Sequence, residues 1–332
     1  MTELTLIATI LILFLSYNHT EAALQVGFYR DKCPSAETII RNEVAKAFVD
    51  NRGIAPGLVR LHFHDCFVRY RVFLCQGCDG SILIDSTSTN QAEKDGPPNG
   101  ITLRGLEVID NAKAKLEATC KGTVSCADIL AYAARDSIVI TGGLYWDVPA
   151  GRRDGRISKA AETSDIPAPF LQLGEITQSF ANKNLSQHDM VALLGAHTIG
   201  RSHCSSFADR LYNFSSTGRQ DPSLNPPFAQ LLKQQCPRNS QGGVSQTDVV
   251  FMNQSPFTMD PSYYGNLFQH NGLFTSDQTL LDSQETTRQI AFYATQGLAW
   301  QADFVQAMIK MSQIQVLTGT EGEIHANCRK IN

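Results

Sequence analysis

The chain has 332 residues, of which 42% are apolar and 18% are charged. This length and composition suit a soluble protein with one large domain or two lobes around a sizeable core. The formal net charge of −4 excludes the strongly basic surface that nucleic-acid-binding domains present.

The N-terminal segment predicts secretion. Residues 4–15 are nearly all apolar, and the small residues Ala22 and Ala23 follow, which is the pattern of a signal peptide. The alternative, a membrane anchor, is disfavoured because about 20 apolar residues are needed to span a bilayer. We therefore expect residues 1–23 to be a cleaved signal peptide and residues 24–332 to form one domain.

If the chain is secreted, its cysteines and its glycosylation sequons can both be interpreted. An oxidising compartment favours disulfides, and the chain has nine cysteines; because nine is odd, one of them is left without a partner within the chain. Sequons for N-glycosylation begin at Asn184, Asn213 and Asn253.

Helical periodicity dominates the remaining sequence, and strand-like alternation is scarce. We expect helices over residues 35–50, from Pro56 onward, over residues 104–118, from Ser125 onward, from Ser186 to His197, and over residues 303–314. Residues 140–170 and 214–260 are rich in Gly, Pro, Ser and Asn and are expected to be long loops. The predicted fold class is all-α with minor β structure.

One stretch, residues 60–81, is dense in reactive side chains. Arg60, His64 and Phe67 recur at helical spacing and share one face. A histidine can move a proton there while a guanidinium stabilises negative charge; the alternative is a surface arginine beside a core histidine. His62 and His64 also suggest a metal pair, as in a metal-dependent hydrolase that includes Asp65, but the two rings point to different faces of a helix.

Hard oxygen donors are interleaved with glycines in the same region. Calcium takes six to eight oxygen ligands, including carboxylates and carbonyls. The alternative is a solvated polar loop. The donors are Asp65, Asp79, Ser81 and Glu93.

Several segments together resemble one family, the secreted plant haem peroxidases (class III). RLHFHDCFV at 60–68 and GCDGSILID at 77–85 resemble its distal motif, and LLGAHTIGRSHC at 193–204 resembles its proximal motif. Further matching segments are EKDGPPN at 93–99, TVSCADIL at 123–130, GRRDG at 151–155, IPAPF at 166–170, DRLYNF at 209–214, GLFTSDQ at 272–278 and NCRKIN at 327–332. The resemblance runs from about Gln25 to Asn332.

The resemblance implies a fold and an activity. The fold is that of the haem peroxidases, with haem b between a distal and a proximal helical lobe. The implied enzyme is a monomer secreted to the cell wall or apoplast. It reduces hydrogen peroxide and oxidises small phenolic donors in one-electron steps through a ferryl intermediate, without nucleic-acid or membrane partners.

The resemblance also assigns roles to single residues. His197 is implied to bind the haem iron, with Asp277 accepting its other ring hydrogen. His64 is the implied distal base and Arg60 the group that stabilises charge on the peroxide, while Asn99 orients His64. Pro167, with Phe170 nearby, is implied to line substrate access.

Two calcium ions and four disulfides complete what the resemblance implies. The distal ion is implied to use Asp65, Val68, Gly77, Asp79 and Ser81, with Glu93 linking it to the distal histidine; the proximal ion is implied to use Thr198, Ser255, Thr258 and Asp260. The implied disulfides are Cys33–Cys120, Cys66–Cys78, Cys126–Cys328 and Cys204–Cys236.

The sequence departs from the family in two places. Eleven residues separate Cys66 from Cys78, where the family has about four, and the surplus (69–75 or 70–76) contains the ninth cysteine, Cys75. The surplus is either a real insertion or a translated intron end, and it motivates an alternative function: a catalytically impaired glycoprotein that binds calcium or the cell wall. Near the proximal site, Met252 stands where the family has an acid, so we expect weaker proximal calcium binding.

Overall fold

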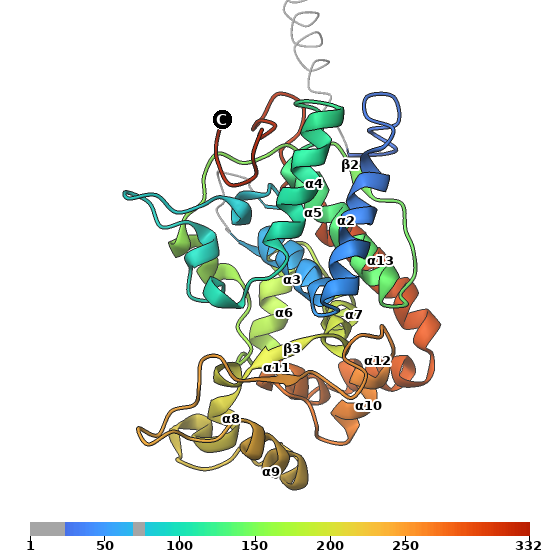
Figure 1. The fold of residues 1–332 in the computed structure, drawn as a ribbon. Helices are drawn as coiled ribbons and strands as arrows, with labels where there is room; N and C mark the ends of the chain where they lie inside the picture. The colour runs from blue at the N-terminus through green and yellow to red at the C-terminus, as the bar shows by residue number, and fades with distance from the viewer. Residues whose placement is uncertain (1–23, 69–76) are drawn as a thin grey trace, which may run out of the picture.

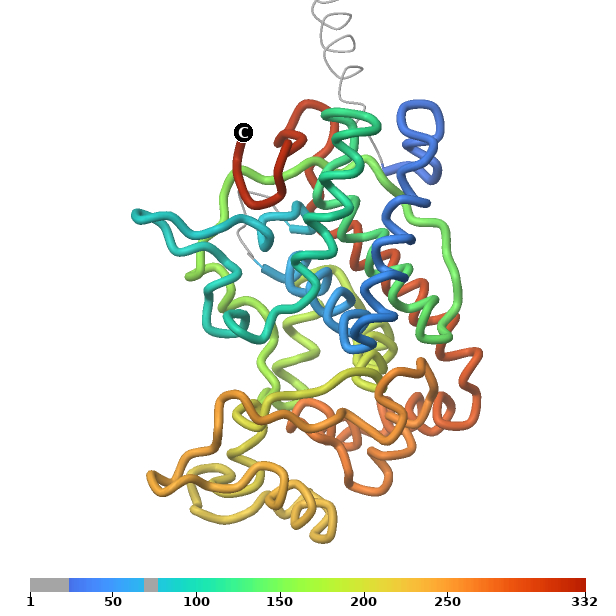
Figure 2. Tube along the Cα trace, viewed as in Figure 1, coloured from blue at the N-terminus to red at the C-terminus, as the bar shows by residue number. Residues whose placement is uncertain are grey.

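The computed structural model describes residues 24–68 and 77–332. The expected signal peptide and the surplus segment with Cys75 lie outside these residues. Figure 1 shows an upper lobe of long helices and a lower lobe of shorter helices and connecting segments, and the trace of Figure 2 follows the chain from one lobe to the other and back to a C-terminus in the upper lobe.

The described residues form helices and two small sheets. The helices are α2 (Ala36–Asp50), α3 (Ile54–Phe67), α4 (Leu106–Thr119), α5 (Cys126–Ile140), α6 (Leu173–Ala181), α7 (Gln187–Leu194), α8 (Ala208–Tyr212), α9 (Pro226–Gln235), α10 (Ser262–Phe268), α11 (Thr275–Gln278), α12 (Gln284–Thr295) and α13 (Gly297–Met311). The strands pair antiparallel, β1 (Gln25–Val26) with β2 (Pro149–Ala150) and β3 (Arg201–His203) with β4 (Val249–Phe251). The predicted all-α class is confirmed.

The upper lobe forms around the buried helix α5. The Ser125 hydroxyl accepts a hydrogen bond from the Asp128 amide at 3.1 Å and caps the helix N-terminus. Helices α2 and α3 pack against α5, and α4 packs against α2. This packing fixes α3, and α3 is the helix that carries Arg60 and His64.

A buried ion pair ties the upper lobe to α13. Arg152 donates to an Asp128 carboxylate oxygen at 2.7 Å, and both side chains are fully buried. Arg152 also donates to the Ser312 carbonyl after α13, and Tyr29 donates to Asp128 at 2.6 Å. These partners satisfy the buried charges and so offset the desolvation cost of placing the pair in the core.

The lower lobe contains a second, smaller apolar core. Figure 1 shows α8 and α9 at the bottom of this lobe. Residues 214–260, predicted to be a loop, include α9 and β4. That prediction was wrong over α9, because Asn225 caps the helix through the Phe228 amide and prolines occupy its first turn. The core residues are Cys204, Phe207, Leu211, Leu224, Ala229, Leu232, Cys236, Val250 and Leu273.

Other helix boundaries moved slightly from their predicted positions. Helix α3 begins at Ile54, before Pro56. The segment expected to be helical to His197 ends as α-helix at Leu194 and continues as a 3₁₀ turn over Gly195–Thr198. Helix α13 begins at Gly297, earlier than the predicted residue 303, and ends at Met311.

Disulfides connect segments that are distant in sequence. The four bridges have the pairing that the family resemblance implies: Cys33–Cys120, Cys66–Cys78, Cys126–Cys328 and Cys204–Cys236. The described residues contain no helix with the length and apolarity that a membrane crossing requires.

Candidate functional site

On the distal side, the site is built around His64, on the buried face of α3. Its Nδ1 lies 2.5 Å from the Asn99 side-chain oxygen. The side-chain nitrogen of Asn99, Nδ2, donates to the Glu93 backbone carbonyl at 2.6 Å. Since a carbonyl only accepts, the Asn99 oxygen must face His64, and Nδ1 of His64 must carry the hydrogen. The other ring nitrogen, Nε2, is then left as a base.

The environment keeps His64 uncharged at neutral pH. Burial, and then the positive charge of Arg60, lower the pKa of His64 well below its usual value, while the hydrogen bond to Asn99 acts in the opposite direction. A neutral imidazole is the form that can accept a proton from a substrate. The electrostatics and the hydrogen bonding therefore both prepare His64 to act as a base.

Arg60 lies one helical turn before His64 and is held by the loop that carries Asn99. Its guanidinium donates to the Pro98 carbonyl at 2.9 Å and to the carbonyl and hydroxyl oxygens of Thr102 at 3.1 and 3.0 Å. Burial lowers the pKa of Arg60 to about 10, so the side chain is still charged at neutral pH. One loop thus positions both distal side chains.

On the proximal side, a short turn after α7 presents His197. Its Nδ1 lies 2.7 Å from an oxygen of Asp277, the residue near the end of α11. The Tyr263 hydroxyl donates to the same oxygen at 3.0 Å. Burial, and then the charge of Asp277, raise the pKa of Tyr263 well above its usual value, so the phenol keeps its hydrogen and the Asp277 oxygen has two donors.

Close packing fixes the turn that carries His197. A Cβ atom at Gly195 would lie 2.5 Å from Trp300 Nε1 and from the Tyr264 hydroxyl, so only glycine fits there. Trp300 and Tyr264 in turn donate hydrogen bonds to carbonyls at the end of α7. The helix end and the histidine after it therefore have one position relative to α10 and α13.

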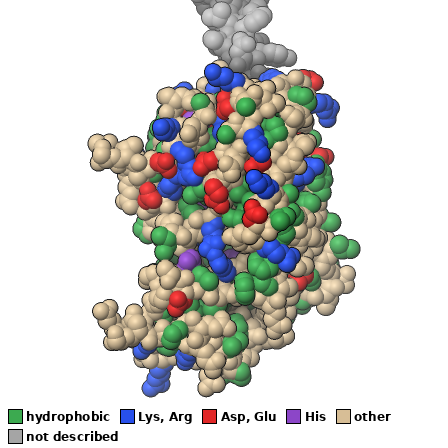
Figure 3. Space-filling view, viewed as in Figure 1, with side chains coloured by type: hydrophobic (Ala, Val, Ile, Leu, Met, Phe, Trp, Pro, Cys, Tyr) green, Lys and Arg blue, Asp and Glu red, His purple; other side chains and the backbone are tan. Residues whose placement is uncertain are grey.

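The two histidines leave one ring nitrogen each for a ligand between the lobes. The side chain of Asp277 is only 1% exposed, whereas that of His197 is 32% exposed, so the imidazole ring is partly open while its carboxylate partner is buried. In the space-filling view, histidine side chains are visible on the face between the two lobes (Figure 3). An imidazole held by a carboxylate, with its other nitrogen facing open space, fits an axial ligand of haem iron.

Comparison with known proteins agrees with this geometry. A family model described as peroxidase matches residues 40–296. The chain is 58% identical over 314 residues to Peroxidase 5 of Vitis vinifera, across 94% of this chain and 92% of the relative. It is 45% identical to Peroxidase 1 of Zea mays, across 99% of this chain and 89% of the relative, and 45% identical to Peroxidase 64 of Arabidopsis thaliana, across 93% of each.

The chain belongs to the peroxidase family. It is a haem peroxidase of the plant type, and the resemblance found in its motifs is confirmed. No finding favours the alternative of an impaired binding protein over an active enzyme.

The peroxidase gathers the expected distal calcium donors in one buried cluster. Asp65 accepts hydrogen bonds from the Gly80 and Ile82 amides, Asp79 accepts one from the Ser81 amide, and the Ser81 hydroxyl donates to Glu93 at 2.8 Å. Burial, and then the charge of Asp79, raise the pKa of Asp65 to about 8. Buried carboxylates close to one another, with a hydroxyl among them, fit a hard cation such as calcium.

Val68 and Gly77, whose carbonyls are expected to complete this cluster, flank the surplus segment. Val68 caps α3, and its carbonyl accepts a hydrogen bond from the buried Lys183 ammonium at 3.4 Å. The Gly77 amide donates to the Gln315 carbonyl at 3.0 Å. These contacts anchor both ends of the segment to the protein.

The expected proximal donors also come together, but they bind one another. Thr198 and Ser255 each donate through their hydroxyls to Asp260, at 3.1 and 2.6 Å. The Thr258 carbonyl accepts from the Asp260 amide at 2.9 Å. Burial raises the pKa of Asp260, but the hydrogen bonds from Ser255 and Ser262 outweigh it and leave this pKa below its usual value.

The segment expected to line substrate access is tied to the proximal side. The Pro169 carbonyl accepts a hydrogen bond from the Ser276 amide at 2.9 Å, next to Asp277. Pro167 is half-buried, and Phe170 is 62% exposed. An exposed aromatic ring on an anchored segment offers an apolar contact for an aromatic donor.

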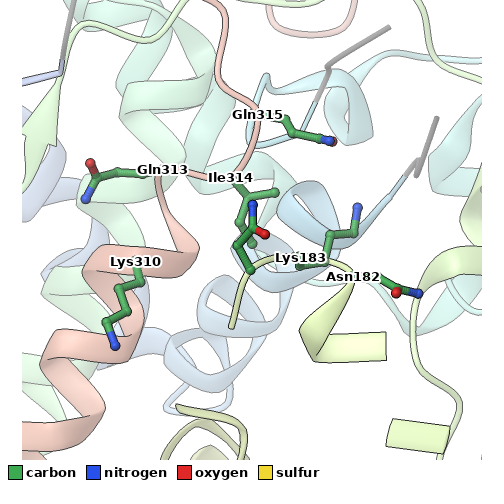
Figure 4. A pocket seen from close by; sticks show the side chains of 7 residues that line it. Asn182, Lys183, Lys310, Gln313, Ile314 and Gln315 are labelled. Atoms are coloured by element: carbon green, nitrogen blue, oxygen red, sulfur yellow. The ribbon is translucent and has the colours of Figure 1, made fainter. Parts of the chain in front are cut away.

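Two other places in the fold are not part of the site. A polar pocket, shown in Figure 4, lies between the α6–α7 turn and the end of α13, and no residue assigned to catalysis lines it. Among the described residues, one group of three Cys, Asp and His side chains has its ligand atoms all within 4.8 Å of one another, Cys126 with Asp154 and His325, but Cys126 is in a disulfide. His62, His64 and Asp65 form no such cluster, so the structure gives no support to a metal-dependent hydrolase.

Sequence reasoning missed three groups that position the candidate catalytic residues. Tyr263 shares the Asp277 oxygen, Thr102 holds Arg60, and the buried Arg210 donates to the carbonyls of Gly272, Leu273 and Phe274 just before α11. Arg210 and the 272–274 segment both lie in motifs of the family resemblance, so these motifs were the available signal. Their roles depend on contacts between distant segments, which a sequence does not display.

Proposed function

We propose that this peroxidase binds haem b between α3 and the turn after α7, reduces hydrogen peroxide on the distal side and oxidises small phenolic donors at the open edge of the site. The observation that supports this most strongly is the matched pair of histidines. Each has its Nδ1 engaged by a buried side chain, Asn99 for His64 and Asp277 for His197, and each keeps its other nitrogen for chemistry.

His197 and Asp277 would hold the haem, which supplies the redox centre when bound. The carboxylate accepts the Nδ1 hydrogen and raises the electron density of the ring, so the imidazole is a strong ligand that favours oxidised states of the metal. Tyr263, as a second donor to the carboxylate oxygen, limits this effect.

The distal residues would handle the proton and the charge. His64 Nε2 takes a proton from hydrogen peroxide and delivers it to the departing oxygen, which leaves as water. Arg60, charged and anchored to Pro98 and Thr102, stabilises the negative charge that develops on the peroxide. Asn99 keeps the Nδ1 hydrogen in place, so His64 begins each cycle as a base.

Further parts of the proposal concern the protein in its setting. Residues 1–23 are a signal peptide, and residues 24–332 are one peroxidase domain that works as a secreted monomer in the cell wall or apoplast. Asp65, Asp79, Ser81 and Glu93, with the carbonyls of Val68 and Gly77, hold a calcium ion beside the distal helix. Pro167 and Phe170 border the entry for phenolic donors.

The test is spectroscopic. The chain is reconstituted with haem and calcium, and its absorption spectrum is recorded before and after one equivalent of hydrogen peroxide and after addition of guaiacol. We expect a haem band that shifts with peroxide and returns with the phenol. Because a positioned base contributes about 10²- to 10⁴-fold, His64→Ala should slow the peroxide-dependent shift by that factor while haem remains bound.

His62→Ala is the matched control, because His62 is a buried histidine on the same helix with no assigned role. The shift in this variant should have the rate of the unsubstituted enzyme. If the two variants were slowed equally, His64 would not be the base. If His197→Ala bound haem with an unchanged spectrum, the proximal assignment would be wrong.

A further inference from the structure

The cluster around Asp260 on the proximal side is a closed hydrogen-bond network. The hydroxyls of Thr198, Ser255 and Ser262 all donate to the two oxygens of the Asp260 carboxylate. The Asn253 side-chain nitrogen donates to the hydroxyl oxygens of Thr198 and Ser262, at 2.9 and 2.8 Å. Each hydroxyl in this network donates to a carboxylate, and two of them also receive an amide hydrogen.

The orientation of the Asn253 amide is fixed by the backbone. Its side-chain oxygen accepts a hydrogen bond from the Ser255 amide at 2.6 Å. A backbone N–H can only donate, so the oxygen must face Ser255 and the NH₂ group must face Thr198 and Ser262. If the side-chain amide were rotated by half a turn, its NH₂ group would face the Ser255 N–H, and two donors would meet. In this position, Asn253 therefore cannot offer its oxygen to a cation.

The network does not fit a calcium ion. Calcium binds lone pairs of carboxylate, carbonyl and hydroxyl oxygens, and here Thr198 and Ser262 each use a hydroxyl lone pair to accept an amide hydrogen of Asn253. Among these side chains only Asp260 is an acid, whereas the distal cluster has three acids in Asp65, Asp79 and Glu93. Met252, which stands where the family has an acid, packs against the apolar core of the lower lobe.

We propose that this peroxidase carries no proximal calcium ion, because the side-chain NH₂ group of Asn253 occupies the position of the cation and links Thr198 to Ser262. Hydrogen bonds alone then hold Asn253, just after β4, against Thr198, the residue next to His197. This inference rests on the proposed function only for the expectation that the family binds an ion there. The enzyme holds calcium at the distal cluster alone.

The test counts calcium ions per chain in the haem-loaded enzyme by elemental analysis, after equilibration with micromolar free calcium. We expect one ion in the unsubstituted enzyme and none in Asp65→Asn, which removes a distal acid. Asn253→Asp replaces the NH₂ group by a second carboxylate oxygen and should raise the count from one to two. Gln254→Glu, the matched control, adds the same charge at the exposed neighbouring position and should leave the count at one.

Two ions in the unsubstituted enzyme, or one ion retained in Asp65→Asn, would overturn the proposal. If Asp65→Asn does not fold, the unsubstituted enzyme and Asn253→Asp still decide the question. The haem band is recorded for each sample, so a failure to bind haem, which would count against the proposed function, is distinguished from a different calcium content.

Asn253 also begins a sequon, which gives an independent test. A glycan is attached to the side-chain nitrogen of asparagine, and in Asn253 this nitrogen is the donor to Thr198 and Ser262. Peptide mass mapping of the chain secreted from a glycosylating host should find Asn253 unmodified and Asn213, an exposed sequon residue, modified. A glycan on Asn253 would refute the network.

Discussion

Substitution of Asn99 by alanine tests how the distal base is prepared. In the structure, the Asn99 oxygen is the acceptor for the Nδ1 hydrogen of His64, and both side chains are buried. Alanine removes the acceptor and leaves this hydrogen without a partner. The hydrogen then has no reason to stay on Nδ1, and when it moves to Nε2 the ring cannot take a proton from peroxide.

The size of the effect follows from the hydrogen bond that is lost. A buried donor without a partner costs about 1–3 kcal/mol, and each 1.36 kcal/mol in a barrier changes a rate tenfold. If the full cost falls on the reactive tautomer, the rate constant for the reaction with hydrogen peroxide should fall by about 5- to 150-fold. Haem binding should be unchanged, because Asn99 does not contact the proximal residues.

The rate is measured by stopped-flow absorbance of the haem band with peroxide in excess. Asn90→Ala is the matched control, because Asn90 lies in the same region and its side chain donates a hydrogen bond to the Ser158 carbonyl at 2.8 Å rather than to Arg60 or His64. A rate constant for Asn99→Ala within twofold of that of Asn90→Ala would refute the reasoning.

Two further predictions concern charge near the haem site. Because burial and then Arg60 lower the pKa of His64 well below its usual value of 6.5, the rate of the peroxide reaction should fall with decreasing pH around a midpoint well below 6.5, where His64 gains a proton. Arg60→Leu should raise the pKa of His64 and move this decline to higher pH, so an unchanged midpoint in the rate–pH profile would contradict the assignment. Tyr263→Phe removes one hydrogen-bond donor from Asp277, and that hydrogen bond is worth about 1 kcal/mol. Because 59 mV corresponds to a tenfold change in a one-electron equilibrium, the haem midpoint potential should fall by about 40 mV. A redox titration that shows no shift, or a rise, would argue against a positioning role for Tyr263.

Local signals in the sequence were enough to predict the helices that carry most of the catalytic groups. Ser125 and Ser186 cap α5 and α7 as the sequence indicates, each through a hydroxyl that accepts an amide hydrogen bond. The helix boundaries were less accurate where tertiary contacts decide them. The end of α7 is such a case, because Trp300 and Tyr264 bind its last carbonyls and a 3₁₀ turn follows.

The motifs predicted which residues meet at the site, but not what holds them there. His64 with Asn99, and His197 with Asp277, lie within hydrogen-bonding distance as the family resemblance implies. Tyr263 reaches Asp277 from α10, a segment that has no recognisable chemistry of its own in the sequence. Contacts of this kind join elements distant along the chain, and only the packed fold displays them.

The two calcium clusters show why a donor list is weaker evidence than a donor arrangement. From the sequence, both sites are sets of hydroxyl and carboxylate residues, and only the proximal one departs from the family in a donor residue, at Met252. In the distal cluster, burial and then the charge of Asp79 raise the pKa of Asp65 to about 8, and a cation relieves this cost. In the proximal cluster, a single amide group in Asn253 satisfies the hydroxyls while the hydroxyls satisfy the carboxylate. A cation added there would replace hydrogen bonds that already exist, so its net gain would be small even though most of the expected ligands are present.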